Sequence, residues 1–281
     1  MSFYACKFSY NEVSCEAYDL EMYSIGSASA GEANIAGTSG IVDEVVGRNW
    51  RPYFYGVQFK NKLTFSLVFG LNEDRLESGQ FLNRTEIHNI STWLTGYTDY
   101  KKLTIDQDDM SDYYYKCMIS GLEVIGSYGE QYAFRATVTC DSPYAYYDAV
   151  ETKKSIEGST QIKLFNSSAL HMPLYPKFII ENIADDELTI INLNEATDGD
   201  ESTAPAFVIR NIPSNVNKII INGDTCVIQA YDEDDDSIDT NLYEDGSVTH
   251  WPRLYSGCNT FIVDGECDVT IKCTFPVNIG A

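Results

Sequence analysis

The chain has few positive charges and no basic cluster. Only 19 lysines and arginines stand against 42 aspartates and glutamates in 281 residues, which gives a formal net charge of −23. The acidity is spread over both halves, because residues 1–150 carry −9 and residues 151–281 carry −14. Such a surface repels polyanions. Nucleic acids and anionic membrane surfaces are therefore poor partners for this chain.

Long apolar runs are also absent. No stretch approaches the roughly 20 apolar residues that a membrane helix needs. The N-terminus, MSFYACKFSYNEV, lacks the basic start and the apolar run of a signal peptide. We expect a protein that stays inside the cell that makes it, or that leaves by a route without a signal.

Motifs for catalysis are missing as well. His88, His171 and His250 lie far apart, and none adjoins a G-x-S-x-G elbow, a second histidine at metal spacing or a reactive-looking cysteine. The sequence has no phosphate-binding loop and no G-x-G-x-x-G motif. We therefore predict that the protein is not an enzyme and has no catalytic residues, no cofactor and no metal.

The eight cysteines include no C-x-x-C pair. Cys117, Cys140, Cys267 and Cys273 fall on the apolar side of runs in which apolar and polar residues alternate. A free thiol at such a position behaves as a small buried hydrophobe. This interpretation is favoured over disulfides and over a metal site.

What the sequence does contain is the pattern of a β protein. Aromatic residues make up 13% of the chain, and short alternating runs recur throughout both halves. The segment Lys60–Lys62 separates two such runs and predicts a hairpin, and Asn222-Gly223 predicts another with a tight turn. One helix is expected, capped by Asn83 with Glu86 completing a capping box, and ended by Gly96. Its apolar positions are Ile87, Ile90, Trp93 and Leu94.

Two segments interrupt the strand pattern. Residues 26–47 are rich in glycine, serine and alanine and predict a long loop or arm. Residues 141–160 follow a strong strand and contain Pro143 with many small and charged residues, which indicates a domain boundary. We expect one domain over residues 1–145 and a second over residues 150–281.

Two surface features could bind ligands. Asp232, Asp234 and Asp236 match the start of a calcium loop, but Ser237 and Tyr243 stand where glycine and glutamate are required. A solvated loop is favoured there over a weak calcium site. The stretch 243–255 contains Trp251 and Tyr255, which could stack on sugars, although packing within the protein is the favoured alternative.

The order of these segments resembles the distal tail proteins of siphophages, which have long non-contractile tails. In the first half the resemblance rests on an ordered set of segments: Phe8–Ser14 with Leu20, Val46–Arg48, the predicted hairpin Val57–Phe69, the helix ending Trp93-Leu94, Lys102–Asp106, Tyr113–Lys116 and Phe134–Tyr144. In the second half it rests on the run WPRLYSGCNTFIVDG, with Pro252, Leu254, Gly257, Asn259, Val263 and Gly265.

The sequence departs from the family at one place and from a related fold at another. The family often has Gly-Arg-Asp-Gly after the arm, where this chain has Gly47-Arg48-Asn49-Trp50. The second domain resembles a galectin, but it lacks the His-x-Asn-x-Arg strand of true galectins. Sugar binding is therefore not inherited from the fold.

The resemblance implies a mainly β fold. The N-terminal domain would be a split β-barrel with one helix and a long arm, and the C-terminal domain a galectin-like β-sandwich. It also implies a homo-hexameric ring, formed by the N-terminal domains at the virion tail tip after synthesis in the host bacterial cytoplasm. The ring would join the major tail tube protein to baseplate and receptor-binding proteins.

Oligomer or partner contacts are expected at Gly47, Arg48, Trp50, Trp251, Arg253 and Tyr255. A soluble carbohydrate-binding β-sandwich protein is the alternative function. A tail or secretion-tube component with the same barrel is a third possibility.

Overall fold

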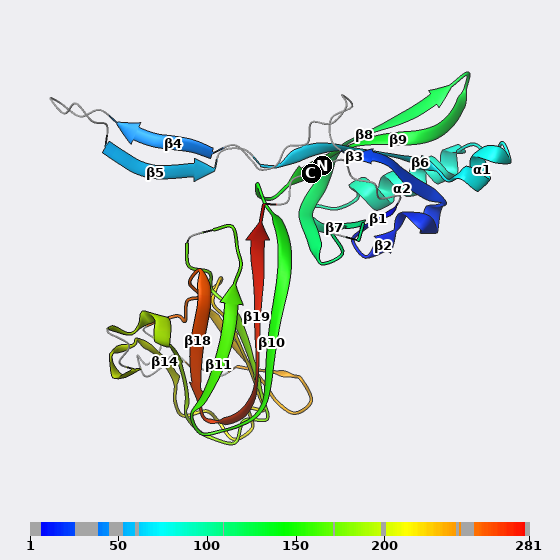
Figure 1. Cartoon of the computed structure of the whole chain (residues 1–281). Helices are drawn as coiled ribbons and strands as arrows, with labels where there is room; N and C mark the ends of the chain where they lie inside the picture. The colour runs from blue at the N-terminus through cyan, green and yellow to red at the C-terminus, as the bar shows by residue number, and fades with distance from the viewer. Residues whose placement is uncertain are drawn as a thin grey trace. The chain divides into compact units, whose positions relative to one another are not determined.

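The computed structural model describes residues 7–25, 39–44, 53–59, 62–108, 110–170, 172–197, 201–239, 242 and 250–278. The chain divides into two compact units (Figure 1). Unit 1 comprises Met1–Tyr147 with Val277–Ala281, and unit 2 comprises Asp148–Pro276. Both are built mainly from antiparallel strands, which confirms the predicted mainly β fold class.

Unit 1 contains an antiparallel sheet with strand order β3-β6-β9-β8-β7-β1-β2. The elements of unit 1 are β1 (Lys7–Tyr10), β2 (Val13–Ser14), the 3-10 helix η1 (Cys15–Tyr18), β3 (Leu20–Ile25), β4 (Ser39–Glu44), β5 (Tyr53–Phe59), β6 (Thr64–Leu71), α1 (Glu73–Glu77), α2 (Arg84–Thr95), β7 (Lys101–Asp106), β8 (Tyr113–Ser127) and β9 (Glu130–Cys140).

The core of unit 1 is aromatic. Phe8 packs on Phe69 and stacks on Trp93, with ring centroids 5.2 and 5.9 Å apart. Phe69 in turn stacks on Phe134 at 5.4 Å, so rings from β1, β6, β9 and α2 form one cluster. The Trp93 indole N–H donates to the Tyr10 carbonyl oxygen at 3.1 Å, which gives this buried polar atom a partner. These contacts fix α2 against the sheet.

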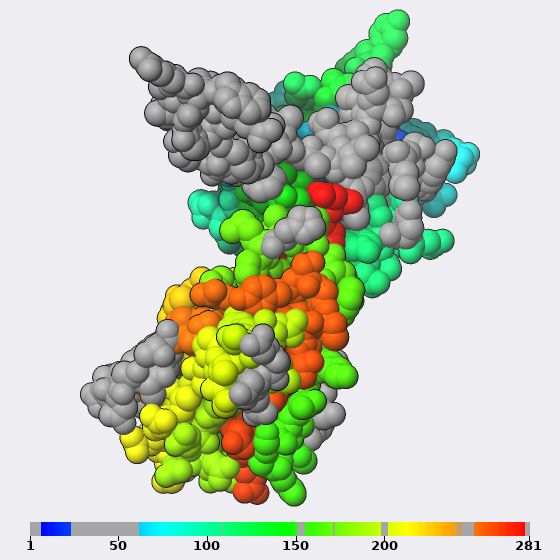
Figure 2. Space-filling view, turned by 60° about the vertical axis from the view of Figure 1, so that its left-hand side comes forward, coloured from blue at the N-terminus to red at the C-terminus, as the bar shows by residue number. Residues whose placement is uncertain are grey.

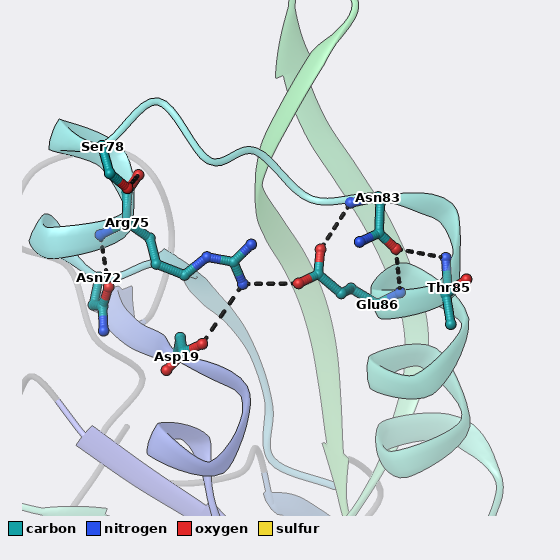
Figure 3. Close-up of polar contacts among 7 residues, drawn as sticks. All are labelled: Asp19, Asn72, Arg75, Ser78, Asn83, Thr85 and Glu86. Carbon is teal, nitrogen blue, oxygen red and sulfur yellow. Dashed lines mark hydrogen bonds and ion pairs between the residues drawn. The ribbon is translucent and has the colours of Figure 1, made fainter.

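Helix α2 has the ends that the sequence predicts. The Asn83 side chain accepts from the backbone N–H groups of Thr85 and Glu86, and the Glu86 carboxylate accepts from the Asn83 N–H (Figure 3). The helix ends at Gly96. The sequence did not predict the short helix α1, whose Arg75 contacts Glu86 Oε1 at 2.9 Å and Asp19 Oδ2 at 3.7 Å (Figure 3).

The prediction of a hairpin around Lys60–Lys62 is wrong, because in the described residues the two flanking strands pair with other strands. Strand β5 pairs with β4, and β6 pairs with β3 and β9. Two alternating runs close together in sequence need not be partners, because alternation shows only that a strand has two different faces. Part of the segment predicted as a loop or arm, Ser39–Glu44, forms β4, and the rest of it lies outside the described residues.

Unit 2 has two antiparallel sheets. One has the order β17-β16-β15-β12-β19-β10 and the other β11-β18-β13-β14. Phe178 of β12 meets Phe261 of β18 edge to face at 5.5 Å, so the two sheets pack as a sandwich. The elements are β10 (Ala145–Glu157), β11 (Thr160–Asn166), β12 (Lys177–Glu181), β13 (Leu188–Asn192), η2 (Leu193–Glu195), η4 (Glu201–Thr203), β14 (Ala206–Ile209), β15 (Lys218–Asn222), β16 (Val227–Tyr231), β17 (Ser237–Ile238), β18 (Gly257–Asp264) and β19 (Glu266–Val277).

The hairpin predicted at Asn222-Gly223 is present, but its turn is longer than expected. Asn222 pairs with Val227, so four residues connect β15 to β16. The left-handed backbone occurs at Cys226, with φ 53°, and not at Gly223. Gly223 is needed for space instead, because a Cβ there would lie 2.8 Å from the Tyr175 Cβ and 3.0 Å from the Pro176 carbonyl oxygen.

The prediction of free buried thiols is confirmed for Cys117, Cys140, Cys267 and Cys273, all of which are buried and unbridged. Cys226 and Cys258 form no disulfide either, but they are exposed. No helix in the described part of the chain is long and apolar enough to cross a membrane.

Candidate functional site

The predicted contact residues fall into two groups. Gly47, Arg48 and Trp50 lie outside the described residues. Trp251, Arg253 and Tyr255 lie together on one extended segment of unit 2, which we call the 250–255 segment, just before β18. The orange region of Figure 2, which includes this part of the chain, reaches the surface of unit 2.

The 250–255 segment has two faces. Pro252 and Leu254 are buried, whereas Trp251, Arg253 and Tyr255 are partly exposed on the alternate positions. Leu254 exchanges two backbone hydrogen bonds with Leu174, of 2.7 and 3.0 Å. The segment therefore behaves as a short strand, and its period of two directs the three predicted side chains to the same side.

Three buried asparagines hold the 250–255 segment in place. Asn192 donates to the Arg253 carbonyl oxygen at 2.6 Å and to Asn259 Oδ1 at 3.0 Å. Asn259 accepts from the Tyr255 N–H at 2.9 Å and donates to the Tyr255 carbonyl oxygen at 2.6 Å. Asn166 donates to the Leu254 carbonyl oxygen at 3.3 Å. A backbone without a regular partner strand thus obtains its hydrogen bonds from side chains.

The outward side chains are also constrained. The Trp251 ring packs against Phe207 of β14, with centroids 5.4 Å apart and ring planes at 54°. A side-chain hydrogen bond with Tyr255, together with the nearby Tyr175, raises the pKa of Arg253 above its already high ordinary value. The segment therefore presents a permanent cation between aromatic groups, which is a combination common in protein–protein contacts.

A buried glutamate side chain lies beneath this surface, and the sequence did not predict it. The Glu195 side chain, at the end of η2, is only 4% exposed and lies in close contact with the His250 imidazole. The pair is not in hydrogen-bond geometry, and both Glu195 oxygens, like the Arg253 Nε, have no hydrogen-bond partner among the described residues. No spacing rule joins residue 195 to residue 250, so sequence patterns could not find this pair.

The other candidate positions show no site for chemistry. His88 is exposed on α2, His250 is paired with Glu195, and His171 lies outside the described residues. In the Asp232–Asp236 loop, Asp232 Oδ1 accepts from the backbone N–H groups of Asp234 and Asp236, at 3.0 and 2.9 Å. Across the described residues no group of three or more His, Cys, Asp or Glu side chains could hold a metal ion.

In unit 1 the most prominent exposed feature is the distal part of the β8–β9 hairpin. Strand β7 pairs with β8 only from Tyr115 to Cys117, whereas β9 follows β8 as far as Ser127. The end of the hairpin projects from unit 1 (Figure 1), and close to its tip the Gln131 carbonyl oxygen accepts from the Leu82 N–H, between the two helices, at 2.8 Å. Tyr128 at its tip is fully exposed with a left-handed backbone, φ 53°. A projecting strand pair with an aromatic tip is suited to contact another subunit.

Comparison with known proteins gives matches over both units. The family model described as a phage tail protein N-terminal domain matches residues 3–142, and the model described as a phage tail C-terminal domain matches residues 144–273. No curated protein matches the chain in sequence.

Among solved structures, the chain is similar to the SPP1 Dit (gp 19.1) protein. That structure is described as a paradigm of hub adsorption apparatus in Gram-positive-infecting phages. The TM-score is 0.63 at 12% sequence identity, and the match covers 96% of this chain and 98% of the other. The two chains therefore share a fold over nearly their whole length, as the resemblance to distal tail proteins implied.

Proposed function

The chain belongs to the phage tail protein family whose N-terminal and C-terminal domain models it matches, and from this premise we propose that it is the distal tail hub of a siphophage or prophage tail. In this proposal copies of unit 1 close into a hexameric ring that continues the tail tube. Unit 2 docks the baseplate and receptor-binding proteins. The observation that carries the proposal is the match of both domains, in order, together with the shared Dit fold over 96% of the chain.

The described surface of unit 1 supports a role in ring formation. In a closed ring each subunit uses two different surfaces, because the contact is heterologous. The distal β8–β9 hairpin is one candidate surface, and the edge strands β2 and β3, at the two ends of the sheet, are others. The Gly47, Arg48 and Trp50 contacts remain a prediction, since these residues are outside the described part of the chain.

The 250–255 segment is the proposed docking surface for tail-tip partners. The backbone that carries its three outward side chains is held by buried asparagines, so little backbone conformational entropy is lost when a partner binds. Trp, Tyr and Arg are also the residues that most often dominate the binding energy of interfaces. The role is structural, and we propose that the protein carries no enzyme activity and binds neither nucleic acid nor membrane specifically.

Two measurements test the hub. Negative-stain images and light scattering of the purified protein should show closed rings of about six copies as concentration rises. Antibodies against unit 2 should label the tail tip of intact particles. Label along the whole tail, or on the capsid, would contradict the proposed location.

The carbohydrate-binding alternative predicts a different result. The Trp251 and Tyr255 rings on one face of a strand give it some support. However, Trp251 already packs on Phe207, which leaves less of the ring for a sugar. A strict monomer that binds glycans in an array, and loses them on Trp251→Ala, would overturn the hub and establish the alternative.

A further inference from the structure

Two buried cysteines of unit 1 face each other directly across a pair of strands. Cys117 of β8 and Cys140, the last residue of β9, are Cα partners in the antiparallel register. Both are fully buried on the core side of the sheet, and both thiols are free. No other two of the described cysteines are partners in the described strand register.

The backbone hydrogen bonds identify the kind of pair that these cysteines form. The Cys140 N–H donates to the Leu63 carbonyl oxygen at 2.9 Å, on the side away from β8. The next residue, Asp141, donates its N–H to the Lys116 carbonyl oxygen at 2.9 Å. Hydrogen-bonded and non-hydrogen-bonded pairs alternate along an antiparallel ladder. Cys117 and Cys140 therefore form a non-hydrogen-bonded pair.

This geometry allows a covalent bond. Cα atoms in a non-hydrogen-bonded pair lie about 4.5 Å apart, with the side chains close together. A disulfide needs Cα atoms roughly 4.4–6.8 Å apart and Cβ vectors that converge. The two thiols therefore meet the backbone requirement without any change of register.

We propose that Cys117 and Cys140 are an oxidative modification site, at which a disulfide forms once the protein leaves the reducing cytoplasm for the oxidising surroundings of a released particle. This change of surroundings rests on the proposed function. The oxidant is a small disulfide such as oxidised glutathione.

The reaction proceeds by two exchanges. One cysteine thiolate attacks the glutathione disulfide, forms a mixed disulfide and releases one glutathione thiolate. The second cysteine thiolate then attacks the protein sulfur of that mixed disulfide, forms the Cys117–Cys140 bond and releases the second glutathione. The two protons that the cysteines lose go to the two glutathione thiolates, so two thiols are oxidised and one disulfide is reduced.

Burial makes the exchange slow in the folded protein. It raises the pKa of Cys140 to about 12 and the pKa of Cys117 further, so the reactive thiolates are scarce at neutral pH. Glutathione also cannot reach either sulfur until this end of the β8–β9 pair opens. In the folded protein the bond should therefore form during local opening, and refolding in oxidant exposes both thiols and allows the same bond.

The position of the bond gives it a mechanical consequence. Cys140 is the last residue of β9, and the chain passes from unit 1 to unit 2 seven residues later, between Tyr147 and Asp148. This connection is one of the two crossings through which a pull on unit 2 reaches unit 1. A bond from Cys140 to Cys117, near the start of β8, would stop this end of β9 from peeling away from its neighbour.

A peptide map of the full chain tests the site. The reduced protein is refolded with oxidised glutathione, quenched in acid, unfolded, alkylated and digested with trypsin. We expect residues 117–135 and 136–153 to appear as one linked species, with a mass two hydrogen atoms below the sum of the two reduced peptides. Cys117→Ala should abolish the species, and Cys273→Ala, which removes another buried strand thiol, should leave it unchanged.

A second measurement uses the natural chain alone, so it does not depend on whether a variant folds. Oxidation of the natural chain should raise its thermal midpoint by roughly 5–10 °C, and a reductant should reverse the rise. Recovery of both peptides separately alkylated after refolding in oxidant, or linkage of either cysteine to a different one, overturns the proposal. The peptide map does not require rings, so a protein that links these cysteines yet stays monomeric contradicts the hub alone.

Discussion

At the scale of single residues, Asn259 determines where the proposed docking surface lies. It is completely buried and takes part in four hydrogen bonds: with the Tyr255 N–H, the Tyr255 and Gly257 carbonyl oxygens, and the Asn192 side chain. An amide has both donor and acceptor atoms, so one side chain can satisfy both kinds of backbone group. An aliphatic residue of the same size would leave those groups buried and unpaired.

Replacing this side chain should therefore weaken unit 2. We expect Asn259→Ala to lower the free energy of unfolding by about 2–4 kcal/mol, because several buried polar groups lose their partner together. Urea denaturation monitored by tryptophan fluorescence measures the change. Lys163→Ala, on the exposed face of β11, is the matched control and should change stability by less than about 0.5 kcal/mol.

A buried thiol in unit 2 makes stability depend on alkaline pH. Burial, with the nearby Asp224 and Asp148, raises the pKa of Cys273 to about 12, above the value of 9.0 that a free thiol has. The folded state thus keeps its proton after the unfolded state has lost it. The stabilisation is complete below pH 9 and is lost as the pH rises towards 12.

The measurable consequence is the slope of the free energy of unfolding against pH. Between pH 9 and 10.5 the free energy of unfolding should fall, with Cys273 contributing about 1 kcal/mol per pH unit. Denaturation curves for Cys273→Ala should show a shallower fall. Cys258→Ala, which removes an exposed thiol, should keep the natural slope. Equal slopes in all three proteins would show that burial of Cys273 does not control this dependence.

At the scale of elements, side chains at the start of α2 connect it to α1 and, through α1, to the 3-10 helix η1. Glu86 caps the backbone of Asn83 and also holds Arg75 of α1, which contacts Asp19 after η1 (Figure 3). Glu86 completes the capping box, so the residue that defines the helix start also positions its neighbour. The position of α1 therefore depends on the N-terminus of α2.

The cap should account for a measurable part of the stability of unit 1. Asn83→Ala removes the acceptor for two backbone N–H groups and should lower the free energy of unfolding by about 1–2 kcal/mol. Chemical denaturation checks the value. Asn83→Ser, which retains an acceptor at this position, should lose much less; a loss as large as that of the alanine variant would refute the capping role.

The elements also show which features a sequence can reveal. Helix α2 was predicted with both ends, because capping residues and apolar spacing act within a few positions of each other. Strand β6 was predicted as a strand but with the wrong partner, since its neighbours β3 and β9 begin 44 residues before and 66 residues after it in sequence. Glu195 and Asn192 were missed because a buried polar residue follows no period.

At the scale of the whole molecule, the chain crosses between the two units twice. It enters unit 2 after Tyr147 and returns to unit 1 at Val277, which packs against the core of unit 1. The two ends of unit 2 lie next to each other, because the Thr274 hydroxyl donates to the Asp148 carboxylate at 2.7 Å. Unit 2 thus lies between two segments of unit 1 in the sequence, and Phe178 and Phe261, which join its two sheets, both belong to it.

Unit 2 should consequently fold without the remainder of the chain. A fragment of residues 148–276 is expected to give a β-type circular dichroism spectrum and one cooperative thermal transition. Light scattering should find it monomeric even where the full chain forms rings, because the proposed ring contacts are in unit 1. A fragment that is unfolded, or that assembles into rings by itself, would contradict this division.

Adjacent ends have a consequence for how such a gene can change over time. Any module whose two termini lie as close as Asp148 and Thr274 could replace residues 148–276 without altering the path of unit 1. Recombination at these two points would exchange unit 2 as a whole while unit 1 is inherited unchanged. One junction alone would not suffice, since the C-terminal residues would then be lost from unit 1. The pairing of Thr274 with Asp148 thus marks the two points at which unit 2 could be exchanged as one module.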